Sequence, residues 1–126
     1  MTTALLVMLG AAVGAPCRWG LDRAVQARHD SVFPWGTFTI NVLGSLALGL
    51  LLGATSFSAV PLELVALVGT GFAGAFTTYS TFSLETVRLF EDGARLVAVA
   101  NVVASLAVGL AAALAGWYLA VALWGG

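Results

Sequence analysis

Five consecutive residues, 77–81, carry hydroxyl groups within the segment GAFTTYSTFS. Gly71 and Gly74 lower helix propensity just before them, and the β-branched threonines that follow lower it further. Ser and Thr side chains also compete for backbone hydrogen bonds. A helix interrupted here would expose carbonyl oxygens that can bind a cation, and the N-terminus of its second half would favour an anion. The residue types leave a second interpretation open, an ordinary kinked helix whose hydroxyls bond back to the preceding turn.

The hydroxyl-rich segment lies in one of four long stretches that lack Asp, Glu, Lys and Arg. These stretches cover residues 1–17, 31–62, 64–84 and 96–126. Charged residues make up 9% of the chain, against about 25% in soluble domains, and about 20 apolar residues let a helix cross a bilayer. The sequence therefore predicts an all-α membrane protein, a single domain with four transmembrane helices. The expected spans cover about residues 3–26, 34–54, 61–90 and 95–124.

The third span is predicted to break at its midpoint, at residues 74–78. This position lies midway between Pro61 and Phe90, hence near the middle of the bilayer. Non-helical backbone survives at that depth only where it is buried in protein or lines an aqueous cavity. The break is therefore the candidate ion site of the chain.

Glycines recur at spacings that suit close helix packing. The pairs are Gly10 with Gly14, Gly49 with Gly53, Gly69 with Gly74, and Gly109 with Gly116. Small residues let helix backbones approach each other in lipid. They predict either packing among the four helices of one subunit or a tight oligomer, and an oligomer is favoured because four short helices alone enclose little room for a pathway.

Other function classes find little support. The net charge of −1 gives no footprint for nucleic acid. An enzyme is not expected, because the chain has one His, His29, one Cys, Cys17, and no metal-ligand cluster, phosphate loop or paired carboxylates at midspan. The first span is not expected to be a signal peptide, since no Lys or Arg precedes it and another span follows soon after.

The segment GAFTTYSTFS, together with FPWGTFTINVLGS at residues 33–45 and GAAVGAPCRW at residues 10–19, resembles the fluoride channel family called Fluc or CrcB. The resemblance covers the four spans, their order, and a motif in each of the first three. It implies a fluoride-specific ion channel that passively exports toxic fluoride across the cell's inner (plasma) membrane. It also implies an antiparallel dimer of four-helix subunits with two pores.

The resemblance further implies one structural Na⁺ at the dimer centre, which is not transported. Backbone carbonyls at the third-helix break would hold it, two from each subunit, and the matched positions are Gly74 and Thr77. A two-fold axis in the membrane plane would bring each midplane break against its copy. Oxygen ligands suit a small hard cation, and its charge would help offset that of a nearby anion.

Two aromatic residues of the same motif are expected to face fluoride with their ring edges. They match Tyr79 and Phe82, and an aromatic ring is electropositive at its edge. Relatives usually carry Phe at the first position, so the hydroxyl of Tyr79 could donate to the ion or hydrate the path. Without the resemblance, plain core packing would explain both rings.

The resemblance assigns further pathway positions to polar residues of three helices. The amide of Asn41 would donate a hydrogen bond to fluoride, although an Asn within a span can equally join helices. Ser80 and Thr81 match polar pore-lining positions, and so does Ser105. Asn101 lies four residues before Ser105, where some relatives carry an aromatic residue.

Two charged residues have open roles. Arg18 matches an electropositive vestibule that attracts anions, or it snorkels to the interface and pairs with Asp22 at i,i+4. Glu85 faces the vestibule or pairs with Arg88 across the helix surface.

All the basic residues fall on one side of the predicted topology. They are Arg18, Arg23, Arg28, Arg88 and Arg95. The positive-inside rule places the first and third loops in the cytoplasm and both termini outside. A chain inserted in both directions should show little such bias. The partner in the antiparallel dimer is therefore either a second copy or a paralogous subunit of opposite orientation.

A small multidrug exporter, also four short helices in an antiparallel dimer, is the alternative transport function. Proton-coupled exchange needs a carboxylate within a span. Glu63 and Glu85 lie only near the ends of the third span, and the first span has none before Asp22. A non-transporting subunit of a membrane assembly, in which the break is merely structural, is a third possibility.

Overall fold

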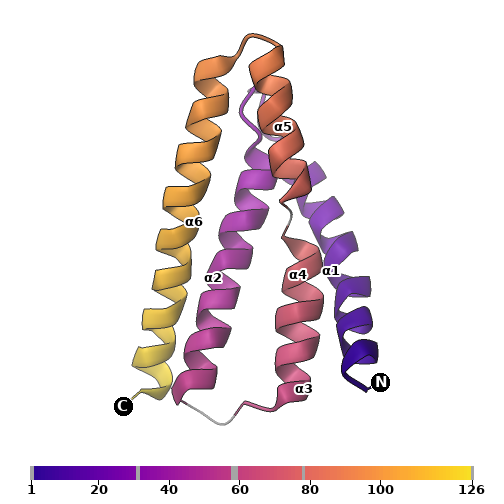
Figure 1. Cartoon of the computed structure of the whole chain (residues 1–126), viewed down its shortest axis with the longest axis vertical. Helices are drawn as coiled ribbons and strands as arrows, with labels where there is room; N and C mark the ends of the chain where they lie inside the picture. Colours follow the sequence, from indigo (N-terminus) through magenta and orange to yellow (C-terminus); the bar gives the residue numbers. More distant parts are fainter. Residues whose placement is uncertain (1, 31, 58–59, 78, 126) are drawn as a thin grey trace.

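The computed structural model describes residues 2–30, 32–57, 60–77 and 79–125. The described chain is helical apart from its connections (Figure 1). The helices are α1 Thr2–Gln26, α2 Trp35–Phe57, α3 Leu62–Leu64, η1 Val65–Ala73, α4 Gly74–Phe76, α5 Ser80–Glu91 and α6 Arg95–Trp124. The third candidate span, Leu62–Glu91, is called the third rod here. Helices α3, η1 and α4 follow one another without interruption and form its first half. Helix α5 forms its second half.

Four helices are long and apolar enough to cross a membrane. They cover Thr2–Gln26, Trp35–Phe57, Leu62–Glu91 and Arg95–Trp124. The prediction of an all-helical chain with four candidate spans is therefore confirmed, and the chain is that of a multi-pass membrane protein. Both termini lie at one end of the molecule, together with the end of α2 and the start of α3 (Figure 1).

Helix α2 is longer than predicted, because the sequence TSF at residues 55–57 was expected to form part of a turn. The hydroxyls of Thr55 and Ser56 instead donate to the carbonyl of Leu52, at 2.7 and 3.0 Å. These bonds use the side-chain donors within the last turn, so the helix continues to Phe57.

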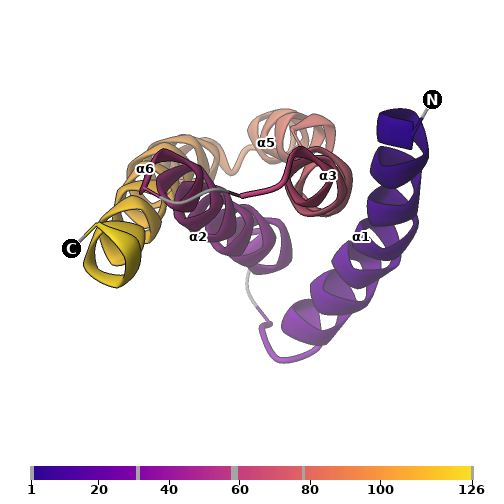
Figure 2. The ribbon, with the colours of Figure 1, turned by 90° about the horizontal axis from the view of Figure 1, so that it is seen from below.

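The helices pack as two close pairs (Figure 2). Helix α2 lies along α6, and α1 lies along η1 at the opposite edge. Glycines permit both contacts: a Cβ added at Gly49 would lie 2.0 Å from the carbonyl oxygen of Ala113, and one at Gly10 would lie 2.1 Å from that of Leu67. The predicted role of small residues in packing within one subunit is thus confirmed at these positions.

A tight turn connects α5 to α6. Gly93 has a positive φ of 87°, which a residue without a Cβ adopts readily. The amide of Ala94 donates to the carbonyl of Leu89 at 2.9 Å, as at many helix C-termini. This turn sets α5 against the first part of α6.

Segment η1 has π-helical hydrogen bonding over nine residues, Val65–Ala73. The sequence analysis did not predict it. π-Helical turns are rare and frequently occur at functional sites. Here the π-helix leads directly into the predicted break.

Candidate ion pathway

The third rod is interrupted at Thr77. Helix α4 ends at Phe76, and Thr77 is extended, with φ −76° and ψ 157°. Its amide donates to the carbonyl of Ala73 at 2.9 Å, and its hydroxyl donates to the same oxygen at 2.8 Å. The interruption and the hydroxyl that bonds back to the preceding turn, which were alternatives at the level of sequence, occur together at this residue.

The interruption begins later than predicted. Gly74 is still helical, and its amide donates to the carbonyls of Gly69 and Gly71. The start of the predicted break is therefore wrong by three residues, because those acceptors hold Gly74 in the helix. Thr78, which the prediction also included, lies outside the described residues. Helical backbone resumes at Tyr79, with φ −91° and ψ −37°.

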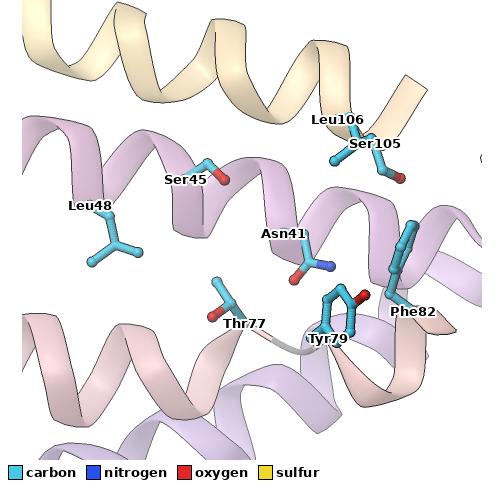
Figure 3. Close-up of a pocket in the computed structure, with 8 residues that line it drawn as sticks. All are labelled: Asn41, Ser45, Leu48, Thr77, Tyr79, Phe82, Ser105 and Leu106. Carbon is cyan, nitrogen blue, oxygen red and sulfur yellow. The ribbon is translucent and has the colours of Figure 1, made fainter. Parts of the chain in front are cut away.

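A cavity of about 280 Å³ lies beside the interruption (Figure 3). Helix α2, the interrupted rod and α6 each contribute to its wall. Its lining residues are Asn41, Ser45, Leu48, Thr77, Tyr79, Phe82, Ser105 and Leu106. Five residues predicted for the ion pathway or the cation site are thus brought together.

Asn41 lies at the centre of this arrangement. Its side chain leaves α2 toward the interruption, between Thr77 and the two aromatic residues (Figure 3). Ser45 lies one helical turn further along α2 and lines the same cavity. Ser45 was not among the predicted pathway residues, although a hydroxyl four residues after Asn41 falls on the same helix face and could have indicated it.

Tyr79 and Phe82 are in contact. Their ring centroids are 6.1 Å apart and their planes are inclined by 44°. Tyr79 is 81% exposed in the single subunit, whereas Phe82 is half-buried. Both rings therefore line the cavity, and the ring of Tyr79 also stands at the surface of the chain.

The remaining predicted pathway residues lie elsewhere. Arg18 and Thr81 line a second cavity of about 170 Å³. Ser80 is exposed at the start of α5, and it is not among the described residues that line either cavity. The structure does not bring Arg18, Ser80 or Thr81 to the cavity beside Asn41.

The second cavity brings charged groups near each other. Asp22 lines it together with Arg18, its predicted i,i+4 neighbour. Thr37, only 2% exposed, lies in the same wall, and its hydroxyl donates to Oε1 of Glu85. Glu85 also borders a further cavity with Arg88, so it lies near both predicted surroundings.

Backbone carbonyl oxygens are the ligands that the interruption offers to a cation. Within the described ranges, no group of three or more His, Cys, Asp or Glu side chains could hold a metal ion. The last carbonyls of a helix have no intrahelical partner, and α4 ends within three residues of Gly74. Gly74 is exposed, and among the described residues a Cβ added there would have one heavy atom within 4 Å, the Gly69 oxygen at 4.0 Å. The helix face at Gly74 is therefore open, and backbone carbonyl oxygens are ligands that fit a hard cation.

The sequence is similar to those of known ion channels of one family. The family model described as CrcB-like protein, Camphor Resistance (CrcB) matches residues 5–117. The chain is 61% identical to the fluoride-specific ion channel FluC 1 of Streptomyces avermitilis, over 95% of this chain and 97% of that protein. It is 59% identical to FluC 1 of Frankia casuarinae, over 96% and 98% respectively.

A more distant relative has the same description. The fluoride-specific ion channel FluC 2 of Mycobacterium tuberculosis is 46% identical over 90% of this chain and 87% of that protein. These proteins are named as channels, which confirms the prediction that the chain is not an enzyme. By the extent of both kinds of match, this chain belongs to the CrcB family, as its three sequence motifs predicted.

Proposed function

We propose that this chain is a subunit of a fluoride-specific ion channel that lets fluoride leave the cell passively across the inner (plasma) membrane. One observation carries the proposal. The cavity beside the interrupted helix is lined by an amide, hydroxyls, aromatic rings and two leucines, and none of the described residues that line it is a carboxylate or a cation. The names of the similar proteins support the choice of fluoride.

This set of groups suits a small anion that has left water. An anion in a protein loses its hydration shell, and selectivity depends on the donors that replace it. The amide of Asn41 and the hydroxyls of Ser45 and Ser105 are such donors. The edge of Phe82 adds positive electrostatic potential without a full charge that would trap the ion.

Fluoride export of this kind needs no energy source in the protein, because the fluoride gradient drives it. Mildly acidic surroundings load a cell with the neutral acid, which dissociates in the cytoplasm. The trapped anion then runs out down its own gradient. Arg18 would attract anions to the vestibule, and the hydroxyls of Ser80 and Thr81 would line the path beyond the first cavity.

A structural Na⁺ completes the proposal. The carbonyl oxygens of Gly74 and Thr77 would hold it together with the same two atoms of an oppositely oriented subunit. The open face at Gly74 supports this arrangement, since a second subunit can approach there. When bound, the ion would join the two subunits and add positive charge near the anion path.

The partner of this dimer is either a second copy in the membrane lipid or a paralogous subunit of opposite orientation. The exposed Tyr79 supports a partner at this face, because its ring stands at the surface of the single subunit. The arginines at one end of the molecule support a fixed orientation and hence a paralogous partner.

Reconstitution tests the proposal. The purified chain, alone and with an oppositely oriented paralogue, is placed in liposomes loaded with fluoride or chloride, and anion release is followed with ion-selective electrodes. We expect fast release of fluoride and negligible release of chloride. Equal rates for the two anions, or no release of fluoride in either preparation, would refute it.

A further inference from the structure

Asn101 is the most deeply buried amide of the described chain. It lies on α6 and is 1% exposed. An amide taken out of water without hydrogen-bond partners costs free energy, so its partners indicate what it does. It does not line the cavity beside Asn41, and the resemblance assigned it no role.

The nitrogen of Asn101 connects α6 to α5. Its Nδ2 donates to Oγ1 of Thr86 at 2.9 Å. The Thr86 hydroxyl in turn donates to the backbone carbonyl of Phe82 at 2.8 Å. Phe82 lines the cavity, so this chain of two bonds runs from the fourth helix to the cavity wall.

The same chain of bonds fixes the orientation of the amide. The single hydroxyl hydrogen of Thr86 is used by the Phe82 carbonyl, so Thr86 can only accept a hydrogen bond from Asn101. The NH₂ group must therefore face α5, and Oδ1 faces the opposite way. There it accepts a hydrogen bond from the hydroxyl of Ser105 at 3.3 Å.

The Ser105 hydroxyl is therefore a hydrogen-bond donor to Asn101. Its hydroxyl hydrogen points to Asn101, although its oxygen lines the cavity. At 3.3 Å the bond exceeds the usual length for O–H···O and is weak. When an anion reaches Ser105, the hydroxyl can rotate and donate its hydrogen bond to the anion, because breaking the weak bond to Asn101 costs little free energy.

We propose that Asn101 is a positioning residue of the ion pathway. It ties α5 to α6 through Thr86, which keeps Phe82 in the cavity wall. It also holds the Ser105 hydroxyl hydrogen until an anion accepts it. The inference rests on the proposed function, because it assigns a role within that pathway.

Two substitutions test the link. Asn101→Leu removes the amide at similar volume, and Thr86→Val removes the hydroxyl with little change of shape. Each should slow fluoride release from liposomes about fivefold, which corresponds to the loss of one ordinary hydrogen bond. The double variant should be no slower than the slower single variant, since both break one chain of bonds. Thr55→Val is the matched control, because Thr55 donates to a carbonyl of its own helix, and its rate should not change.

Hydrogen–deuterium exchange supplies a second readout that needs no fluoride. Amides of α5 should exchange faster in Asn101→Leu and in Thr86→Val, and at the original rate in Thr55→Val. Unchanged exchange and unchanged release in both variants would overturn the inference. Faster exchange with an unchanged rate of release would also overturn it, because the link would then serve the fold alone. If Asn101→Leu fails to fold, Thr86→Val decides.

Failure of the proposed function would look different. In that case the unmodified chain would release no fluoride, with or without a paralogue, and the pathway role of Asn101 would fail with it. Exchange in α5 would still report whether Asn101 ties the two helices together. Slower release combined with faster exchange in both variants, against an active unmodified chain, supports the inference.

Discussion

Gly44 on α2 lies directly against Thr77, the extended residue of the interrupted helix. A Cβ added at Gly44 would lie 2.0 Å from Cγ2 of Thr77, closer than side chains can pack. The glycine therefore lets α2 approach the interruption closely enough for Asn41, one turn earlier, to face it.

Gly44→Ala should accordingly disturb the interruption. We expect a loss of about 1–3 kcal/mol in the free energy of unfolding, the usual cost of overpacking, and slower fluoride release. Thermal melting in detergent and release from liposomes measure the two effects. Gly20→Ala is the control, since a Cβ at Gly20 meets nothing within 4 Å. Equal behaviour of the two variants would contradict the role of Gly44.

Phe82→Ile should slow fluoride release while leaving the melting temperature within a few degrees of the original. The variant keeps an apolar side chain but removes the electropositive ring edge from the cavity wall. Phe57→Ile, at the exposed end of α2, provides the matched control. The prediction fails if both variants release fluoride at the original rate.

Asn41→Asp should reduce fluoride release more than tenfold. The substitution replaces an N–H donor with an acceptor of negative charge, at a position where an anion must pass. Asn41→Ser keeps a donor and should retain part of the activity. If the aspartate variant were as active as the serine variant, the amide could not be a donor to the ion.

Na⁺ should stabilise the purified protein. A ligand that binds only the folded assembly raises the melting temperature with its concentration. We therefore expect protein purified without Na⁺ to melt at a lower temperature in a bulky organic cation than in NaCl of equal ionic strength. Gly44→Ala should weaken this difference, because it displaces Thr77. Identical melting in both salts would argue against a Na⁺ site at Gly74 and Thr77.

A reporter fused to the C-terminus should lie outside the cytoplasm in most molecules. Arg23 and Arg88 lie in the last turns of α1 and α5, and Arg95 begins α6. These helix ends lie opposite both termini (Figure 1), and the positive-inside rule retains that end in the cytoplasm. Protease or alkylation accessibility in intact cells measures the orientation. Reporter on both faces of the membrane in similar amounts would instead indicate a dimer of two identical copies.

The sequence was sufficient to predict the four spans, because lipid demands long uncharged helices and this requirement is visible in composition. It also indicated an interruption or a kink, since Gly71, Gly74 and the run of hydroxyls all disfavour a helix. The residue at which the helix stops could not be predicted. Gly74 stays helical because of its bonds to two carbonyls, those of Gly69 and Gly71, and such pairing depends on the local helix type.

The candidate pathway was predicted in part. Asn41, Tyr79 and Phe82 came from two family motifs and Ser105 from a matched position on the fourth span, and the structure gathers them around one cavity. The connection from Asn101 to Thr86 could not be read from the residues, because it joins positions fifteen apart across the turn at Gly93. Its geometry depends on how α5 and α6 meet.

The π-helical segment η1 determines which way the second half of the third rod is turned. Each residue of an α-helix advances by about 100° around the axis, so one residue more or fewer changes every later direction by that angle. A π-helical residue advances by less, so uniform α-helical bonding over the same residues, Val65–Ala73, would turn Thr77 away from Gly44. A helical wheel drawn from the sequence with a uniform period would therefore assign the wrong side of the rod to the lipid.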